Sequence, residues 1–385
     1  MKKKPAPKRR KKASTRPATE LPVDDRPPDL VTRDRFLVWR FPRVGYGNPH
    51  RMTNPTWAWL ASRPELNAYM ANRHFDGPSS MEVGPGWCAN RFGQSRTELA
   101  DGRVIAVGGE HEDYYDPDFF IYNDVFVTSA SGEIDIYGYP LEVFPPTDFH
   151  SATLAGDRLV IIGCVGHPRQ RVPGRTPVFS LDLTSLAITQ LRTDGEPPGW
   201  ISKHTAQLGA DQTSIVVRGG QRFELASGAQ VFRDNADDWS LDLGSLSWTR
   251  LTDRRWQELE FERSDGKANH LFTIWCMSWH VTGDSPFDQE QRQKHLDELG
   301  FQPDFALYAA RFTPPVTHRV LTSEDHPRIF CIEVDGVTVR YVEDHRSVRI
   351  VVEGPLPEAQ VAALAEDARR KLGELEHTDY VVRKP

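Results

Sequence analysis

The chain has 385 residues, a formal net charge of −7, 38% hydrophobic residues and 26% charged residues, which is the composition of an ordinary globular protein. It contains no run of 18 apolar residues, and no apolar segment follows its basic start, so the sequence predicts neither a membrane span nor a signal peptide. The four cysteines lie far apart, which argues against a zinc ribbon or a disulfide scaffold and predicts a cytoplasmic protein, or a nuclear one in a eukaryote.

Residues 1–33 differ sharply from the rest of the chain. Residues 1–20 carry nine Lys or Arg and one Glu, a net charge of +8, which leaves −15 for the remainder. The segment has no apolar periodicity, so we predict a disordered basic, Pro-rich tail. A nucleic-acid contact or a nuclear address at residues 8–12 is one interpretation, and a solubilising tail is the other. The acidic body repels phosphate and therefore disfavours the nucleic-acid partner.

Residues 34–91 are predicted to be an N-terminal elaboration. Residues 36–41 are apolar enough for a strand, and residues 55–60 and 64–70 suggest short helices. Ser62 is expected to cap the second helix, with Glu65 completing a capping box.

Three parallel units follow between residues 92 and 251. Their apolar runs, at residues 104–107, 159–162 and 215–217, each lead into a glycine, and these glycines are 55 and 56 residues apart. Ser95, His150 and His204 stand before these runs, and each is followed four residues later by a leucine. Two further strands joined by a tight turn close each unit, at about residues 124–134, 178–188 and 238–251. A period of about 50 residues with four strands per unit is typical of propeller blades.

The third unit carries the fullest motif, which consists of Gly219-Gly220, Asp238-Trp239, Asp242 and Trp248. The second unit has Cys164 for the second glycine and Ile188 for the last tryptophan, and the first keeps Gly108-Gly109 but has Thr128 and Ile134. This pattern resembles the kelch repeat family. The resemblance implies a mainly β fold with a kelch-like β-propeller over residues 92–321, comprising three clear blades and one degenerate one. The degenerate blade would use strands at residues 270–275, 305–312 and 317–321, with a helix inserted between Ser285 and Gly300.

Residues 322–385 are predicted to form a small C-terminal α+β unit. Asp335-Gly336 is a strong turn signal between strands at residues 328–334 and 337–342, and a third strand covers residues 347–352. A helix over residues 357–375 and a last strand at residues 380–382 complete the unit.

The candidate binding residues lie on one face of the repeats. Because strands alternate in direction, the long loops after Gly109, Gly166 and Gly220 share a face with Ser95, His150 and His204. Aromatic and arginine side chains dominate interface energetics. The residues that we select there are Tyr114, Tyr115, His150, Arg169, Arg171, Arg175, His204 and Arg222.

No motif for chemistry stands out. The acidic loop 110–118 could hold a divalent cation, but its spacing matches no metal motif, so we predict no metal ligand. There is no Walker loop, Gly-x-Ser-x-Gly, His-Glu-x-x-His or dinucleotide motif, and no residues match the copper–tyrosyl site of kelch-type oxidases. We therefore predict no cofactor and no catalytic residue.

Two functions remain open. The first is a non-enzymatic scaffold that binds another protein through the loops of one propeller face. The alternative is an enzyme or a carbohydrate-binding protein whose central polar pocket is formed by His150, His204 and the acidic loop 110–118.

Overall fold

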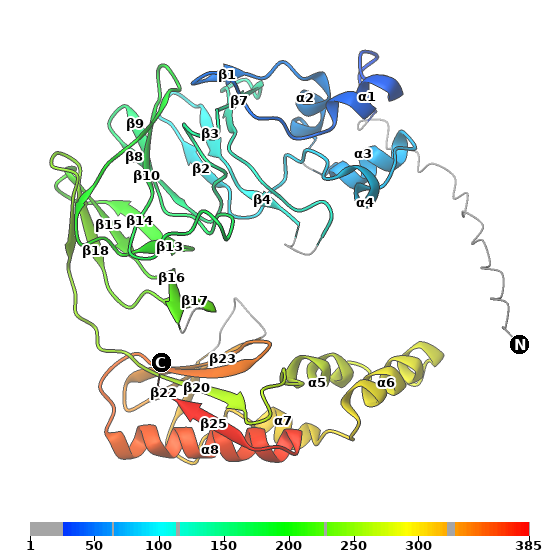
Figure 1. The fold of residues 1–385 in the computed structure, drawn as a ribbon, viewed down its shortest axis with the longest axis vertical. Helices are drawn as coiled ribbons and strands as arrows, with labels where there is room; N and C mark the ends of the chain where they lie inside the picture. Colours follow the sequence, from blue (N-terminus) through cyan, green and yellow to red (C-terminus); the bar gives the residue numbers. More distant parts are fainter. Residues whose placement is uncertain (1–25, 64, 113–115, 227–228, 322–327, 385) are drawn as a thin grey trace, which may run out of the picture. The chain divides into compact units, whose positions relative to one another are not determined.

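The structure is a computed structural model that describes residues 26–63, 65–112, 116–226, 229–321 and 328–384 (Figure 1). The predicted disorder of the tail concerns mainly residues 1–25, which lie outside these ranges. The chain divides into unit 1, residues 1–252, and unit 2, residues 253–385, and each is described by itself. Both units contain antiparallel sheets, so the predicted mainly β character is confirmed.

In its described residues, unit 1 contains three main sheets, each built on a meander of four antiparallel strands of one repeat, and two smaller sheets of three and two strands. No sheet in the described part of the chain closes into a barrel or a ring, so a propeller is not confirmed. Short strands β1 (His50–Arg51) and β12 (Asp194–Gly195) extend the first and third sheets. The first meander is β2 (Ser95–Glu98), β3 (Val104–Val107), β6 (Val125–Thr128) and β7 (Ile134–Gly138); the second is β8 (Ser151–Ala155), β9 (Arg158–Ile162), β10 (Val178–Asp182) and β11 (Ile188–Gln190); the third is β14 (Thr205–Leu208), β15 (Ser214–Arg218), β18 (Trp239–Asp242) and β19 (Ser247–Arg250).

The three sheets pack face to face, with an apolar layer between each neighbouring pair. Ile105 and Val107 of the first sheet meet Leu159 and Ile161 of the second. The opposite face of the second sheet packs on the third, whose predicted core residues Trp239 and Trp248 are 2% and 4% exposed. Successive residues of a strand point to opposite faces of the sheet. Because both faces of the middle sheet are covered by a neighbouring sheet, consecutive residues of its strands are apolar.

The far face of the third sheet is polar and ends the stack. It carries Thr205, Gln207, Val216, Arg218, Ser240 and Thr249, of which one is apolar. The space around the glycine that follows the second strand of each repeat also shows that the third sheet has no neighbour of this kind among the described residues. A Cβ on Gly108 or Gly163 would lie 2.2 or 2.1 Å from a carbonyl oxygen of the next repeat, whereas one on Gly219 would meet nothing within 4 Å. A polar outer face is the usual form of a terminal repeat.

The register of the repeats differs by one residue from the sequence prediction. The residue before the first glycine pairs with Ser95, Ser151 and Thr205 in the three sheets. Gln94, His150 and His204 are therefore equivalent. The leucine spacing misled the alignment because the turn after the first strand differs in length between repeats.

Helices cover the outer face of the first sheet. They are α1 (Arg33–Trp39), α2 (Pro55–Ala61), α3 (Ala68–His74) and α4 (Ser80–Val83). Buried side chains of these helices include Phe36 and Trp57, which pack with Trp87 of the segment after α4 and with Phe126 of the first sheet. We call this the helical layer.

Two local predictions in the helical layer are wrong. Residues 36–41 form no strand, because Thr32 caps α1 and the segment buries Phe36 while Val38 is 62% exposed. Ser62 ends α2 instead of starting the next helix, and Asn67 caps α3 by accepting from the amide of Met70.

Unit 2 is a six-stranded antiparallel sheet in the order β21-β22-β23-β24-β20-β25, with helices packed on it. The predicted hairpin, third strand, helix and last strand are all present, as is the helix capped by Ser285 and ended by Gly300. The elements are β20 (Gln257–Arg263), α5 (Leu271–Ser278), α6 (Pro286–Leu299), α7 (Phe305–Ala310), β21 (Arg319–Leu321), β22 (Ile329–Val334), β23 (Val337–Glu343), β24 (Ser347–Val352), α8 (Glu358–Glu376) and β25 (Tyr380–Arg383).

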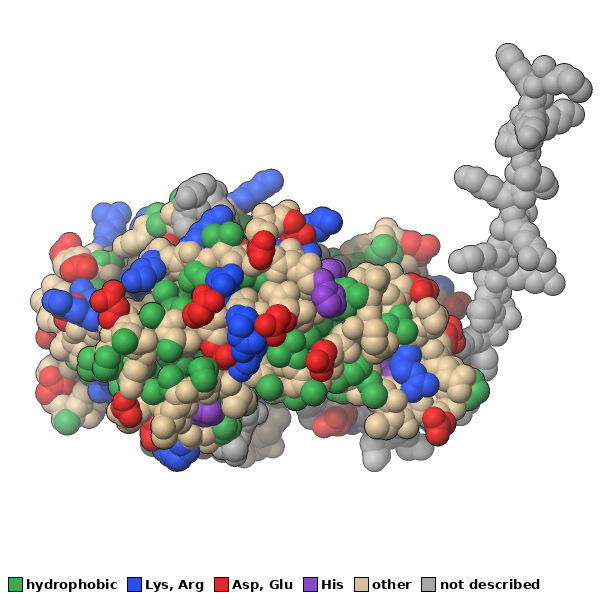
Figure 2. Space-filling view, turned by 90° about the horizontal axis from the view of Figure 1, so that it is seen from below, with side chains coloured by type: hydrophobic (Ala, Val, Ile, Leu, Met, Phe, Trp, Pro, Cys, Tyr) green, Lys and Arg blue, Asp and Glu red, His purple; other side chains and the backbone are tan. Residues whose placement is uncertain are grey.

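The predicted fourth repeat is wrong in its local structure. Residues 270–275 and 305–312 form α5 and α7, and the strand near residue 319 joins the sheet of unit 2. In α5 the buried residues are Leu271, Ile274 and Met277, a helical spacing, and Asp304 caps α7. Figure 2 shows acidic, basic and apolar side chains interspersed over one face of the molecule.

Candidate functional site

A pocket of about 560 Å³ lies at the end of the first two sheets where their long loops emerge. We call it the loop-face pocket. The loop after Gly109 contributes Glu110, Phe119 and Ile121, and the loop after Gly163 contributes residues 165–168 and Arg171. Phe149 and Lys203, which precede the first strands of the second and third sheets, complete it. The predicted face of loops therefore does carry a hollow.

Phe149 and Lys203 in the lining of this pocket occupy equivalent repeat positions, and Gly93 is their counterpart in the first repeat. Gly93, Phe149 and Lys203 have φ angles of 61°, 47° and 56°, all in the left-handed region. The amide of Phe149 donates to the carbonyl of Gly93 at 2.8 Å, and the amide of Lys203 donates to that of Phe149 at 2.8 Å. Two of the three repeats thus hold a side chain in a conformation that costs about 1–3 kcal/mol for a residue other than glycine.

Basic groups line one side of the pocket. Arg171 donates to the carbonyl oxygens of Val165 at 3.0 Å and Gly166 at 2.9 Å, and its guanidinium lies 4.9 Å from the ring centroid of Phe232. These contacts fix its orientation. Lys203 is exposed, and its ammonium lies 5.2 Å from the ring centroid of Phe149. Burial lowers the pKa of His167, which favours its neutral form.

A pair of carboxyl groups lies beside these basic groups. Asp148 is fully buried, and one carboxyl oxygen accepts from the amide of Gly166 at 2.6 Å. Its other oxygen receives no donor from the described residues. Burial raises the pKa of Asp148, and the neighbouring Glu110 partly offsets this.

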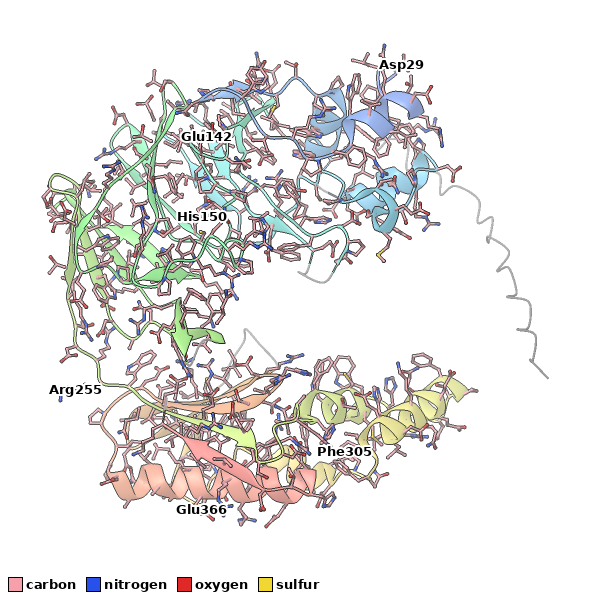
Figure 3. All side chains as sticks on the ribbon, in the orientation of Figure 1. Asp29, Glu142, His150, Arg255, Phe305 and Glu366 are labelled. Atoms are coloured by element: carbon pink, nitrogen blue, oxygen red, sulfur yellow. The ribbon has the colours of Figure 1, made fainter. Side chains whose placement is uncertain are left out.

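His150 and His204 do not line the pocket; they link neighbouring sheets. His150 Nε2 lies 2.8 Å from Ser95 Oγ, and His204 Nε2 lies 2.9 Å from Ser151 Oγ. Burial lowers the pKa of His150 to about 3 and that of His204 to about 4, so both are neutral at pH 7. Figure 3 shows His150 among the strands of unit 1. They therefore do not face the loop-face pocket, as the alternative prediction had them, because each side chain lies buried at a sheet interface.

The other predicted binding residues are dispersed. Tyr114 and Tyr115 lie outside the described residues. Arg169 and Arg175 are exposed on the loop that carries Arg171. Arg222 pairs with Glu224 at 3.1 Å. Its loop forms strands β16 (Gln221–Ala226) and β17 (Ala229–Asp234), and β16 pairs with both β17 and β13 (Trp200–Ser202).

The acidic loop does not gather into one cluster. Glu110 and His111 form strand β4 with Phe120–Ile121 of β5, while Asp118 accepts from the amide of Gly86 in the helical layer. His111 Nε2 lies 3.3 Å from a carboxylate oxygen of Glu112. Burial acts to lower the pKa of His111, but the hydrogen bond with Cys88 and the charges of Cys88, Glu112 and Asp118 together raise it. Among the described residues, no three His, Cys, Asp or Glu side chains are placed to hold a metal ion together.

Sequence reasoning missed Asp148, Phe149 and Lys203. The signal that could have found them is their place beside the histidines. Once Gln94, His150 and His204 are aligned, Gly93, Phe149 and Lys203 fall at one repeat position, where glycine stands in the first copy. A glycine at such a position indicates a left-handed backbone in all three.

Comparisons with known proteins add little. No protein-family model and no curated protein matches the chain. A solved mannose phosphorylase from Leishmania mexicana, in complex with a phosphate ion, aligns over 70% of this chain and 69% of its own with 13% identity. The TM-score is 0.28, and a similarity of that size supports no conclusion about fold or function. None of the helices within the described ranges is long and apolar enough to span a membrane.

Proposed function

We propose that unit 1 is a binding module that holds a segment of a partner protein in the loop-face pocket. In this proposal its three sheets are kelch-like repeats, supported by their four-stranded meanders and by the Gly-Gly, Asp and Trp motif of the third copy. The proposal assigns no catalytic residue to the protein.

The observation that carries the proposal is the left-handed backbone at Phe149 and Lys203. Glycine would occupy these positions without strain, as Gly93 does in the first repeat. Strained backbone persists at functional sites, where a side chain is worth its conformational cost. Both side chains line the pocket, which supports a role in binding.

The lining favours a partner segment with an acidic side chain beside an apolar one. Lys203 and Arg171 provide positive charge, and Phe119, Phe149 and Ile121 provide apolar surface. Arg171 is already oriented by backbone carbonyls, so less side-chain entropy is lost on binding.

The test compares two glycine substitutions at left-handed positions. Lys203→Gly removes a pocket side chain and relieves strain. Gln212→Gly relieves the same kind of strain, at φ 59°, but it removes a side chain from the exposed turn after β14, outside the pocket. A partner isolated with the full-length protein should bind Lys203→Gly at least about tenfold more weakly than Gln212→Gly. Both variants should melt at or above the wild-type temperature, because glycine suits this backbone. Equal partner affinities for the two variants would refute the proposal.

A second candidate, an enzyme that uses the same pocket, is favoured by the pair Asp148 and Glu110. A buried carboxyl group with a raised pKa beside a second carboxyl group is a source of general acid and base chemistry. Glu110→Gln retains a hydrogen-bonding group beside Asp148 but cannot take up and release a proton. Loss of a chemical conversion of the bound molecule, followed by mass spectrometry, with its affinity retained would favour the enzyme.

A further inference from the structure

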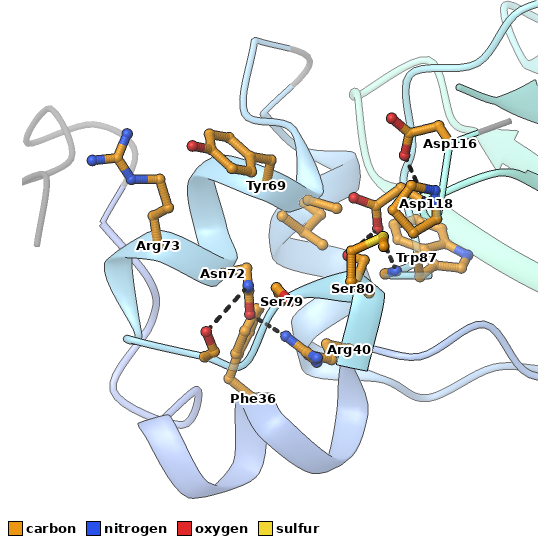
Figure 4. Close-up of a pocket in the computed structure, with 16 residues that line it drawn as sticks. Phe36, Arg40, Tyr69, Asn72, Arg73, Ser79, Ser80, Trp87, Asp116 and Asp118 are labelled. Carbon is orange, nitrogen blue, oxygen red and sulfur yellow. Dashed lines mark hydrogen bonds between the residues drawn. The ribbon is translucent and has the colours of Figure 1, made fainter. Parts of the chain in front are cut away.

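A second pocket, of about 390 Å³, lies in the helical layer. Figure 4 shows that its labelled side chains come from α1, α3 and α4, from the segments that flank α4 and follow α1, and, with Asp116 and Asp118, from the loop of the first repeat. Most of the lining is apolar and includes Phe36, Leu60 and Trp87. The ring of Trp57 stacks behind that of Trp87 at 4.9 Å, which makes this wall rigid.

Arg40 lines this pocket and is 5% exposed. Its Nη1 donates to Oδ1 of Asn72 and to the carbonyl oxygen of Pro78 at 3.2 Å. Its Nε is buried and has no acceptor among the described residues. No carboxylate of the described residues lies within ion-pair distance of Arg40, and burial lowers its pKa.

Arg91, in the same layer, shows how the fold satisfies a buried guanidinium when no ligand is needed. Its Nη2 lies 3.0 Å from Asp124, and its Nε and Nη1 donate to the carbonyl oxygens of Cys88 and Gly108 at 2.7 and 3.0 Å. A buried charge without a counterion is costly, and buried charges in proteins are ordinarily paired. Arg40 departs from that rule, and it does so in the wall of a pocket.

Asp118 limits where an anionic group can lie. It also lines the pocket and attracts Arg40 without contacting it. One oxygen of Asp118 accepts from Ser80 Oγ at 2.5 Å and from the amide of Gly86 at 3.2 Å, which ties the segment after α4 to the loop of the first repeat. Repulsion by Asp118 leaves the Arg40 end as the place for a negative charge.

We infer that this pocket binds a small carboxylate with an apolar or aromatic body. The carboxylate would lie against the Arg40 guanidinium, a planar group whose N–H donors suit carboxylate oxygens. The body would lie against Phe36, Leu60 and Trp87. This site is separate from the loop-face pocket, so the inference does not depend on the proposed function.

The experiment uses the full-length protein and four probes in isothermal titration calorimetry. The probes are 3-phenylpropionate, its uncharged amide, phenethylamine and inorganic phosphate. We expect 3-phenylpropionate to bind at least tenfold more tightly than each of the others. Equal binding of the amide would show an apolar cavity without charge recognition, tighter binding of the amine would assign the site to Asp118, and tighter binding of phosphate would assign it to a different anion. Each of these results, or no binding of any probe, overturns the inference.

Two arginine variants and one control locate the site. Arg40→Lys keeps the buried charge but loses the planar fork and should weaken 3-phenylpropionate binding at least tenfold. Arg43→Gln removes an exposed arginine that donates to the carbonyl of Val38 at 3.0 Å, outside the pocket, and should leave binding unchanged. Equal weakening by both variants would refute a specific role for Arg40.

If Arg40→Lys does not fold, NMR of the wild type decides. The Nε–H of Arg40 should shift on addition of 3-phenylpropionate, and the Nε–H of Arg91 should not. An unshifted Arg40 signal at saturating ligand would place the ligand elsewhere and overturn the inference.

Discussion

The sheet interfaces of unit 1 and the helix–sheet interface of unit 2 bury polar groups in opposite ways. Between the sheets of unit 1, neutral contacts repeat, with His150 against Ser95 and His204 against Ser151. In unit 2 the buried contacts are ionic. Arg263 pairs with Glu376 at 2.5 Å, Arg311 with Glu343 at 2.6 Å and Lys371 with Asp367 at 2.8 Å.

The difference follows from how each core is assembled. A repeated sheet meets each neighbour through the same short side chains, so one neutral hydrogen bond can be copied from interface to interface. In unit 2, segments 113 residues apart meet at Arg263 and Glu376, and long side chains from a helix and a strand span the gap. Removing one partner therefore leaves an uncompensated charge in unit 2 but only an unsatisfied neutral group in unit 1.

The largest effect is expected at the ion pair of unit 2. Glu376 is completely buried, and Arg263 Nε and Nη2 also hold Asp265. Arg263→Met leaves the Glu376 carboxylate buried without its cation and should cost about 3–5 kcal/mol of unfolding free energy. Chemical denaturation followed by circular dichroism measures the loss, and hydrogen exchange should place it in β20 and α8.

The double variant Arg263→Met with Glu376→Leu is the control for that loss. Replacing both charges with apolar groups should restore most of the stability, because no charge remains buried. If the double variant is as unstable as Arg263→Met, packing rather than charge explains the loss, and the contrast between the units fails.

The next effect is expected in the apolar layer between the second and third sheets. Trp239 is 2% exposed there, and its Nε1 donates to Asn235 at 3.1 Å. Trp239→Ala should cost about 3 kcal/mol through the cavity that it leaves. Hydrogen exchange should quicken in β15 and β18 and stay unchanged in β24. A loss below about 1 kcal/mol would show that Trp239 does not hold the two sheets together.

The smallest effect per residue is the acid response of the two neutral contacts. The folded pKa values of His150 and His204 are lowered to about 3 and about 4, so both histidines stay neutral in the fold while the unfolded chain takes up protons below about pH 6.5. Their contribution to stability is complete above pH 6.5 and is lost as the pH falls toward 4. At pH 5 we expect a loss of roughly 2 kcal/mol per histidine.

The measurement is the melting temperature between pH 7 and 5 for the wild type and for the variant His150→Gln with His204→Gln. The variant should show a flatter acid limb. Asp148 acts in the opposite sense, since its raised pKa gives stability that is lost as the pH rises, but it is present in both proteins and cancels in the comparison. Identical acid limbs would mean that the histidines titrate normally and are not buried between the sheets.

Local patterns gave most of the strands. The apolar runs before Gly108, Gly163 and Gly219 became β3, β9 and β15, and the helical spacing of residues 357–375 became α8. Short apolar segments were the failures, because residues 36–41 and 270–275 are too brief for periodicity to separate helix from strand. The site was predicted only as a face of loops. Arg171 lines a pocket there, whereas the two histidines lie in the sheet interfaces, and Ser95 was aligned with them one residue out of register.

The sequence by itself determined the repeat, its period and the burial of Trp239, because these depend on spacing along a strand. The polar residues on the outer face of the third repeat also mark the end of the stack, although they can be assigned to one face only when the strand pairing is known. Tertiary structure alone decided that β20 joins strands more than eighty residues later in the chain, that Asp148 meets Glu110, and that Arg40 is buried without a carboxylate. Each of these depends on which distant groups meet and on what burial does to their charge, and one-dimensional spacing carries no information on either.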